Sequence, residues 1–215
     1  KLLDDLVKRE LAIQEARKIG LDKDPEIQDR MNTVLYQSLI ERKLSKEMEK
    51  LDVSDSEAQS YYNKYPEVRT SHIFVAVRPG ANAAEEKKAR DKIQKINDEF
   101  IKPGTMGFAE IAQRYSEGVA APMGGDIDYQ NKDKLDPTYY DTALKLKTPG
   151  KVSGIIRTQF GYHIVKLTAI RSWDETDHPL VKRFVFEEKR TAIFDKYMNQ
   201  LRTQAKVQIN PQLLK

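Results

Sequence analysis

Residues 158–170, TQFGYHIVKLTAI, decide the fold of the central part of this chain. After the turn at Gly161, the stretch from Tyr162 to Ile170 alternates in side-chain character, as a strand with one covered face does. The segment just before it, Val152 to Arg157, is also rich in β-branched residues. The two segments therefore predict neighbouring strands at the end of a folded unit.

Upstream of these strands the sequence predicts two further strands and three helices. One strand, SHIFVAV, covers residues 71–77 and stops at the turn signal Arg78-Pro79-Gly80. The remaining segments, in chain order, are helices over 83–101 and from Phe108, a short strand over 127–129 and a helix over 137–146. The order β-α-α-β-α-β-β describes an α+β unit of about 100 residues, which we place at 68–171.

Helices are also predicted on both sides of this unit. Apolar residues recur at helical spacing over 1–19, and Asp24 caps a second helix that starts at Pro25. Ser54 and Glu57 have the spacing of a capping box, which predicts a third helix ending near Pro66. A last helix is predicted over about 180–205, followed by a short tail over 207–214.

These flanking helices are predicted to form one module. Their apolar stripes favour burial, so we expect residues 1–67 and 172–215 to pack together as an all-α module. The unit 68–171 would then be inserted between its two halves. Two interpretations of this module stay open, a plain scaffold and an apolar groove that holds unfolded chains. The aromatic and Met residues considered for such a groove are Met31, Tyr36, Met48, Tyr61, Tyr62, Phe184 and Phe186.

Composition excludes several classes of function. The chain has no Cys, so disulfides, thiol catalysis and zinc fingers are excluded, and its three His residues are too few for us to expect a metal site. The net charge is +4, but the basic residues are interleaved with acidic ones, which argues against a nucleic-acid binder. No apolar run approaches the roughly 20 residues that cross a bilayer. The chain begins at Lys1 inside an amphipathic pattern, so we expect that residues upstream were removed, with a membrane anchor among them in one arrangement.

Five short motifs occur in order within the central unit. They are RTSHI at 69–73, FAEIA with Tyr115-Ser116 at 108–116, GGD at 124–126, PGKVSG at 149–154 and TQFGYHI at 158–164. Together they resemble the parvulin-type (PpiC, or rotamase) peptidyl-prolyl cis-trans isomerases. The flanks, notably residues 11–24 and 53–57, resemble the SurA, PrsA and PpiD group of periplasmic folding factors. The resemblance implies a parvulin domain, with a four-stranded antiparallel sheet and about four helices, inserted in an all-α chaperone-like module.

The resemblance also implies the residues of an active site. His72 and His163 correspond to the paired histidines on the floor of the parvulin site, and Thr158 to a hydroxyl that fixes their tautomers. We therefore expect His72, His163 and Thr158 to be catalytic. Leu135, Tyr139 and Phe160 are expected to bind substrate, with Leu135 and Tyr139 forming the proline pocket. This alignment places one extra residue, relative to the family pattern, within 146–150 and after the helix. If the extra residue lies earlier, the residues assigned to the pocket shift by one position.

Two departures from the family pattern affect the expected activity. Gly118 stands where many parvulins carry Cys or Asp, and Asp128 stands where Gly is common, so the activity could be weak. The loop 78–84 contains one Arg and no basic cluster, so the substrates are expected to be unphosphorylated X-Pro segments. No cofactor is expected, because rotation about a prolyl amide breaks no covalent bond.

The sequence thus leads to one main hypothesis and one alternative. The main hypothesis is an extracytoplasmic or periplasmic isomerase and chaperone that acts on unfolded or nascent exported polypeptides. The alternative is a holdase whose parvulin domain is catalytically weak or silent. No nucleic-acid partner is expected, and a homodimer is one expected assembly.

Overall fold

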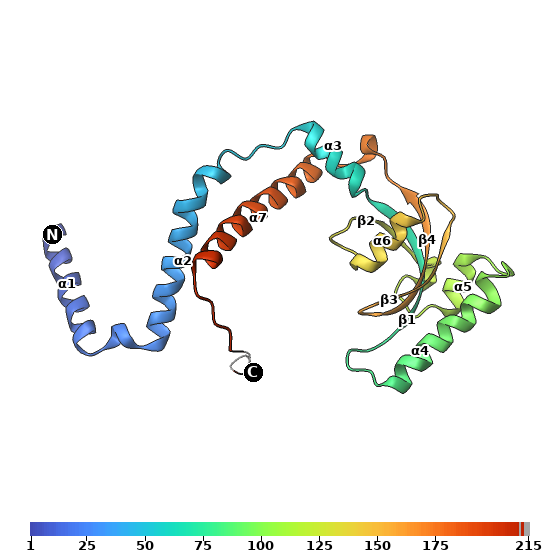
Figure 1. Cartoon of the computed structure of the whole chain (residues 1–215), viewed down its shortest axis with the longest axis horizontal. Coiled ribbons are helices and arrows are strands. Elements are labelled where there is room, and N and C mark those ends of the chain that lie inside the picture. Colours follow the sequence, from blue (N-terminus) through green and yellow to red (C-terminus); the bar gives the residue numbers. More distant parts are fainter. Residues whose placement is uncertain (211, 213–215) are drawn as a thin grey trace. The chain divides into compact units, whose positions relative to one another are not determined.

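The computed structural model describes residues 1–210 and 212 and divides the chain into two compact units (Figure 1). One unit is Val53–Val185, and the other combines Lys1–Asp52 with the segment from Phe186 onward. Among the described residues, no helix has both the length and the apolar character needed to cross a membrane. The tail predicted over 207–214 falls partly outside the described residues.

The unit 53–185 is built on a four-stranded antiparallel sheet. Its strands are β1 (Val68–Ala76), β2 (Asp126–Gln130), β3 (Val152–Thr158) and β4 (Gly161–Ile170), in the order β2-β1-β4-β3. The central pair places Ile73 opposite Ile164 and Phe74 opposite His163. All four predicted strands are confirmed, and the strongly alternating β4 lies at the centre of the sheet.

Helices cover both faces of this sheet. The helices α4 (Ala83–Ile96) and α5 (Phe108–Tyr115) pack on the face that carries Ile73, Val75 and Ile164. The helix α6 (Pro137–Lys145) packs on the opposite face, against Val165 and Leu167. Since side chains alternate along a strand, His72 and His163 lie on the α6 face.

Local signals in the sequence place most helix ends. Asn82 and Glu85 form a capping box at the start of α4, and the side chain of Asp136 accepts a hydrogen bond from Thr138 N at the start of α6. A 3₁₀-helix at Ala121–Met123 adds a short fourth helix between β1 and β4. The helix predicted over 83–101 differs from the structure, because α4 ends at Ile96 and a π-helical turn, Asn97–Ile101, follows.

The same unit contains α3 (Asp55–Lys64) and the first turns of α7 (His178–Gln204). The predicted capping box of Ser54 and Glu57 is present at the start of α3. The ring of Tyr62 lies 5.7 Å from that of Trp173, and Glu67 pairs with Arg171 at 2.9 Å. The three-part division at residues 67/68 and 171/172 stays a prediction.

The second unit contains α1 (Leu2–Lys18), a 3₁₀-helix (Leu21–Lys23), α2 (Pro25–Met48) and the rest of α7. Asp24 caps α2 by accepting hydrogen bonds from Glu26 N and Ile27 N, as predicted. No residue of α1 is buried, and its Leu2 is 77% exposed. On α2, Leu35 is 66% exposed. For α1 and the first half of α2, the expectation that the apolar stripes are covered is therefore wrong within the described residues.

Candidate active site

A pocket of about 420 Å³ opens on the α6 face of the sheet. It brings together all six residues predicted to form the site, which are His72, Leu135, Tyr139, Thr158, Phe160 and His163. The two histidines come from the adjacent central strands β1 and β4, Thr158 ends β3, and Tyr139 lies on α6. Leu135 and Tyr139 line the pocket together, although α6 begins only at Pro137.

The floor of the pocket is a cluster of aromatic rings. The centroids of the His72 and His163 rings are 5.5 Å apart, and Tyr139 stands edge-on to both, at 5.8 Å and 5.5 Å. Phe74 stacks on His163 at 4.7 Å. His163 is 6% exposed and Tyr139 3% exposed, so both rings are held in fixed positions by their neighbours.

Two hydroxyl groups fix the orientation of this cluster. Thr158 Oγ1 lies 2.8 Å from His163 Nε2 in a hydrogen bond whose donor depends on the tautomer. Thr158 Oγ1 also accepts a hydrogen bond from Phe160 N at 3.3 Å, which ties the β3–β4 turn to the histidine. On the other side, Thr70 Oγ1 and the Tyr139 hydroxyl form a buried hydrogen bond of 2.9 Å.

Burial keeps both histidines neutral. It lowers the pKa of His72 from the ordinary 6.5 to about 4, because the imidazolium would lose its hydration. Burial also lowers the pKa of His163 to about 4, with repulsion from His72 as a second cause. Burial raises the pKa of the Tyr139 hydroxyl, so Tyr139 stays protonated. The floor of the pocket therefore presents uncharged polar groups near neutral pH.

The comparisons with known proteins agree with this geometry. Residues 72–169 match the Rotamase family, described as the PPIC-type PPIASE domain. This segment of the chain belongs to that family. The recognition made from the five motifs is therefore confirmed, and the sheet and helices described above are the fold of a PPIase domain of this type.

Curated relatives extend the similarity beyond the PPIase domain. The foldase protein PrsA of Geobacillus sp. (strain WCH70) is 38% identical over 123 residues, which are 56% of this chain and 39% of that protein. The foldase protein PrsA of Caldanaerobacter subterraneus subsp. tengcongensis is 28% identical over an alignment that covers 100% of this chain and 71% of that protein. The chain thus spans well under half of the Geobacillus protein.

One solved structure supports the fold of the chain. The crystal structure of peptidylprolyl isomerase (PrsA) from Bacillus cereus is 22% identical, covers 96% of this chain and 76% of its own, and has a TM-score of 0.50. At this identity the likeness concerns the fold alone. It agrees with a PPIase domain inserted between helical segments.

The side chain missing at Gly118 has a direct structural effect on the PPIase domain. A Cβ atom at residue 118 would lie 3.1 Å from His72 Nε2, so any side chain there would touch the histidine. The buried Nδ1 atoms of His72 and His163 have no hydrogen-bond partner among the described residues. Within the described residues, Thr158 thus hydrogen-bonds one ring of the pair, and both Nδ1 atoms lack a partner.

The second departure, Asp128, has a local explanation. Asp128 has a φ of +58°, in the left-handed region that glycine adopts most readily. Its N–H donates to Asp126 Oδ1 at 2.9 Å, and Asp126 pairs with Arg69. This turn holds the left-handed conformation without a glycine, and it lies outside the pocket lining.

The pocket is also lined by three residues that the sequence analysis did not single out: Ile127, Lys134 and Asp136. Ile127 follows the GGD motif on β2, and Lys134 and Asp136 flank Leu135 in the loop before α6. Their proximity to GGD and Leu135 in the sequence was the available signal. Among the described residues, no cluster of side chains is arranged to bind a metal ion.

Proposed function

We propose that this protein is a peptidyl-prolyl cis-trans isomerase and chaperone that acts on unphosphorylated X-Pro segments of unfolded exported proteins. The observation that carries the proposal is the pocket that combines the apolar side chains of Leu135, Tyr139 and Phe160 with a floor of two neutral histidines. The PPIase family match and the relatives named foldase support it.

The reaction requires selective binding and no covalent step. Rotation about an X-Pro amide faces a barrier of roughly 18–20 kcal/mol. A catalyst must bind the twisted amide more tightly than either planar isomer, and each ~1.4 kcal/mol of this preference gives about a tenfold rate increase. An apolar slot for the proline ring, with polar groups beside the rotating carbonyl, meets this requirement.

The residues of the pocket suit these two tasks. Leu135, Tyr139 and Phe160 provide apolar surface for the proline ring, and Phe160 is 58% exposed and forms the outer wall. His72, His163 and Thr158 provide hydrogen-bonding groups on the floor. In the proposed mechanism they orient the substrate carbonyl and shield it from water, and no proton is transferred.

The preference for unphosphorylated segments rests on the charges near the pocket. The single Arg of the loop 78–84 pairs with Glu85, and Arg157 at the end of β3 pairs with Glu86 at 2.7 Å. A phosphate bound near proline would compete with these carboxylates. Phosphate recognition in proteins favours clusters of Arg with open donors, whereas the described residues that line the pocket include one Lys, Lys134, and no Arg. A phosphorylated residue before proline therefore gains little here.

Unfolded exported polypeptides are the proposed partners, and the bacterial envelope outside the cytoplasm is the proposed location. The names of the relatives, foldase protein PrsA and chaperone SurA, support unfolded polypeptides as partners, and the location rests on the resemblance of the flanking segments to periplasmic folding factors. Attachment to a membrane and assembly as a homodimer stay predictions. Sedimentation of the purified chain tests the second directly.

A second function is favoured by Gly118. Because residue 118 contributes no side chain beside His72, the pocket could bind prolyl segments without accelerating their rotation. The protein would then act as a holdase that keeps clients soluble.

One experiment separates the two functions. The cis/trans exchange of unphosphorylated Ala-Pro and Leu-Pro peptides is measured by NMR with and without protein, beside light scattering of a denatured client diluted into buffer. Accelerated exchange establishes the isomerase. Suppressed scattering with unchanged exchange establishes the holdase, and failure of both assays rejects both functions.

A further inference from the structure

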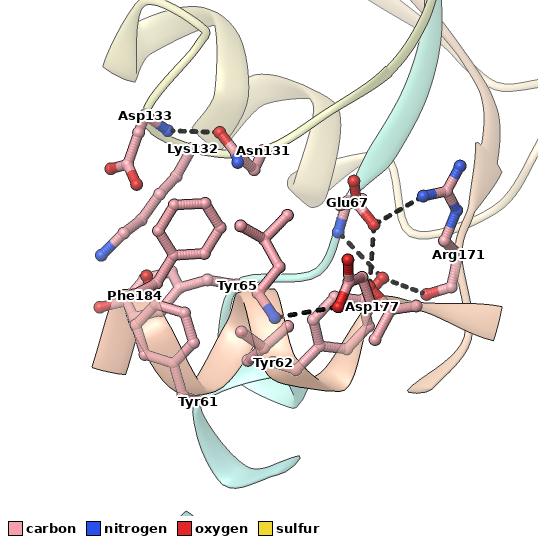
Figure 2. Close-up of a pocket in the computed structure, with 13 residues that line it drawn as sticks. Tyr61, Tyr62, Tyr65, Glu67, Asn131, Lys132, Asp133, Arg171, Asp177 and Phe184 are labelled. Atoms are coloured by element: carbon pink, nitrogen blue, oxygen red, sulfur yellow. Dashed lines mark hydrogen bonds and ion pairs between the residues drawn. The ribbon is translucent and has the colours of Figure 1, made fainter. Parts of the chain in front are cut away.

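A second pocket lies in the same compact unit as the PPIase domain (Figure 2). Its lining comes from α3 and the residues after it, the loop before α6, the end of β4 and the first turns of α7. Residues 131–133 of the loop line this pocket, while residues 134–136 line the candidate active site. The two pockets therefore share one short loop.

One wall of the second pocket consists of aromatic rings that hold a cation. The rings of Tyr61 and Tyr65 are 5.3 Å apart, and Phe184 adds a third ring to the lining (Figure 2). The ammonium group of Lys132 lies 4.2 Å from the centroid of Tyr65 and 4.9 Å from that of Tyr61. An ammonium at such distances is attracted to the ring faces, so the wall is suited to a positive charge.

The polar part of the lining also favours a cation. Glu67 is bound within the protein, by Arg171 at 2.9 Å and by the Thr176 hydroxyl at 3.0 Å. Beyond this pair, the exposed side chains of Asp133 and Asp177 bring two more carboxylates to the pocket. Carboxylates beside aromatic faces attract Lys and Arg side chains and repel acidic ones.

The shared loop limits the distance between the two pockets. Lys132 and Leu135 are three residues apart, so their Cα atoms are at most roughly 10–11 Å apart. An extended client chain with its proline at Leu135 covers this distance in about three residues, and a less extended chain in up to about five. A client segment of this length is therefore long enough to span the distance between these two residues of the loop.

We propose that the second pocket is a client subsite that takes a Lys or Arg side chain located three to five residues from the isomerised proline. The client cation replaces the ammonium of Lys132 on the faces of Tyr61 and Tyr65. The subsite selects basic prolyl segments among unfolded clients. This inference rests on the proposed function for its choice of client, but binding to the subsite is measurable without catalysis.

The test uses the 215-residue chain and peptides with one Ala-Pro bond. A single Lys is placed three, four or five residues before or after the proline, and matched peptides carry norleucine or Glu in its place. Affinities come from ¹⁵N chemical-shift titrations. At the best spacing we expect the Lys peptide to bind about fivefold more tightly than the norleucine peptide, and the Glu peptide to bind most weakly.

Three variants locate the effect. Tyr61→Leu removes one aromatic face and is expected to abolish the preference for Lys over norleucine, while Tyr61→Phe keeps the face and the preference. Lys132→Met removes the ammonium that lies over both rings, while that of Lys64 remains 5.0 Å from the Tyr65 centroid, and is expected to tighten binding of the Lys peptide about threefold or more. If Lys132 only held the loop in place, Lys132→Met would weaken all peptides alike.

Several results would overturn the subsite. They are equal affinities for Lys and norleucine at every spacing, a Lys preference that survives Tyr61→Leu, or Lys132→Met weakening all peptides. Failure of the proposed function looks different, because no peptide would then show accelerated exchange. In that case the titrations still decide whether the second pocket binds Lys.

Discussion

His72 and His163 are the residues whose surroundings most constrain the proposed chemistry. Both are neutral near pH 7 because burial lowers each pKa to about 4, and the buried Nδ1 atoms have no partner among the described residues. A neutral pair can orient a carbonyl by hydrogen bonding without adding a charge that the apolar walls would disfavour.

Protonation of these histidines is expected to destabilise the fold. In the unfolded chain the two histidines bind protons near pH 6.5, and in the folded chain only near pH 4. The unfolded state therefore carries more protons between these two pH values. The free energy of unfolding should be fully retained above about pH 6.5 and fall as the pH drops toward 4. Urea denaturation from pH 4.5 to 7.5 measures this slope. An identical slope in the double variant His72→Phe/His163→Phe would contradict the assignment.

Thr158 is the other residue with a testable role. Thr158→Val keeps the shape of the side chain but leaves buried His163 Nε2 without its partner at 2.8 Å. We expect a loss of about 1–3 kcal/mol in the free energy of unfolding, together with slower peptide exchange. Thr158→Ser restores the hydroxyl and should recover most of both. Equal values for the Val and Ser variants would show that the hydroxyl is not needed.

At the scale of the elements, the contact between β1 and the GGD turn fixes one side of the pocket. His72 N donates to Gly125 O at 2.9 Å, and Gly125 has a φ of +78°. A Cβ atom at residue 125 would lie 2.2 Å from the backbone oxygen of His72. The glycine therefore allows the two backbones to meet beside the histidine.

Replacing this glycine is expected to be costly. Gly125→Ala should reduce the free energy of unfolding by more than about 3 kcal/mol, since both the positive φ and the clash oppose it. Gly150→Ala is the matched control, because Gly150 has a φ of +90° and nothing lies within 4 Å of an added Cβ. It should cost only about 1 kcal/mol. Thermal unfolding compares the two, and equal losses would mean that the close approach is unimportant.

Elements set by local signals could be predicted from the sequence. The caps at Asp24 and Ser54 and the extended conformation of β4 depend on neighbours within a few residues, and all are present in the structure. The burial along β4 does not alternate, because His163, Ile164 and Val165 are all buried where helices cover both faces of the sheet. The π-helical turn at Asn97–Ile101 was missed because Phe100 continues an ordinary helical spacing. A π-helical turn contains one residue more than an α-helical turn, and here both Phe100 and Ile101 pack on the core. Whether this turn forms depends on the sheet against which it packs.

The candidate site shows the same limit. The alternating strand pattern by itself predicts that His72 and His163 are hydrogen-bonded core histidines, and only the family motifs predicted that they share a pocket with Leu135 and Tyr139. Asp136 and Lys134 were missed because their contribution depends on how the loop before α6 folds back over β1 and β4. Tertiary contacts of this kind leave no periodic trace in a sequence.

At the scale of the whole molecule, exposed apolar side chains set the second unit apart from the PPIase domain. The most exposed of them on α1 and α2 are Leu2, Leu3, Leu11, Val34 and Leu35. Whether an amphipathic stripe is covered depends on its partners, so the sequence could predict the stripe but not its exposure. Such surfaces favour binding to other apolar chains.

This unit is expected to carry the chaperone activity. Val34→Ser/Leu35→Ser lowers the apolar area of α2 and should weaken the suppression of client aggregation at least twofold, with peptide exchange unchanged. Light scattering and exchange measurements on the same protein check this. If the variant suppresses aggregation as well as the original chain does, client binding takes place elsewhere.

The central claim is that the pocket containing Leu135 and His163 isomerises prolyl bonds. The most direct test is the cis/trans exchange rate of one unphosphorylated Ala-Pro peptide, measured by NMR with the original chain, with Leu135→Ala and with Leu11→Ala. Leu11 is 59% exposed on α1, so Leu11→Ala is the control that makes the same substitution outside the pocket. We predict clear acceleration by the original chain and by Leu11→Ala, and about a tenfold loss in Leu135→Ala. Equal acceleration by all three proteins, or none by any, would contradict the claim.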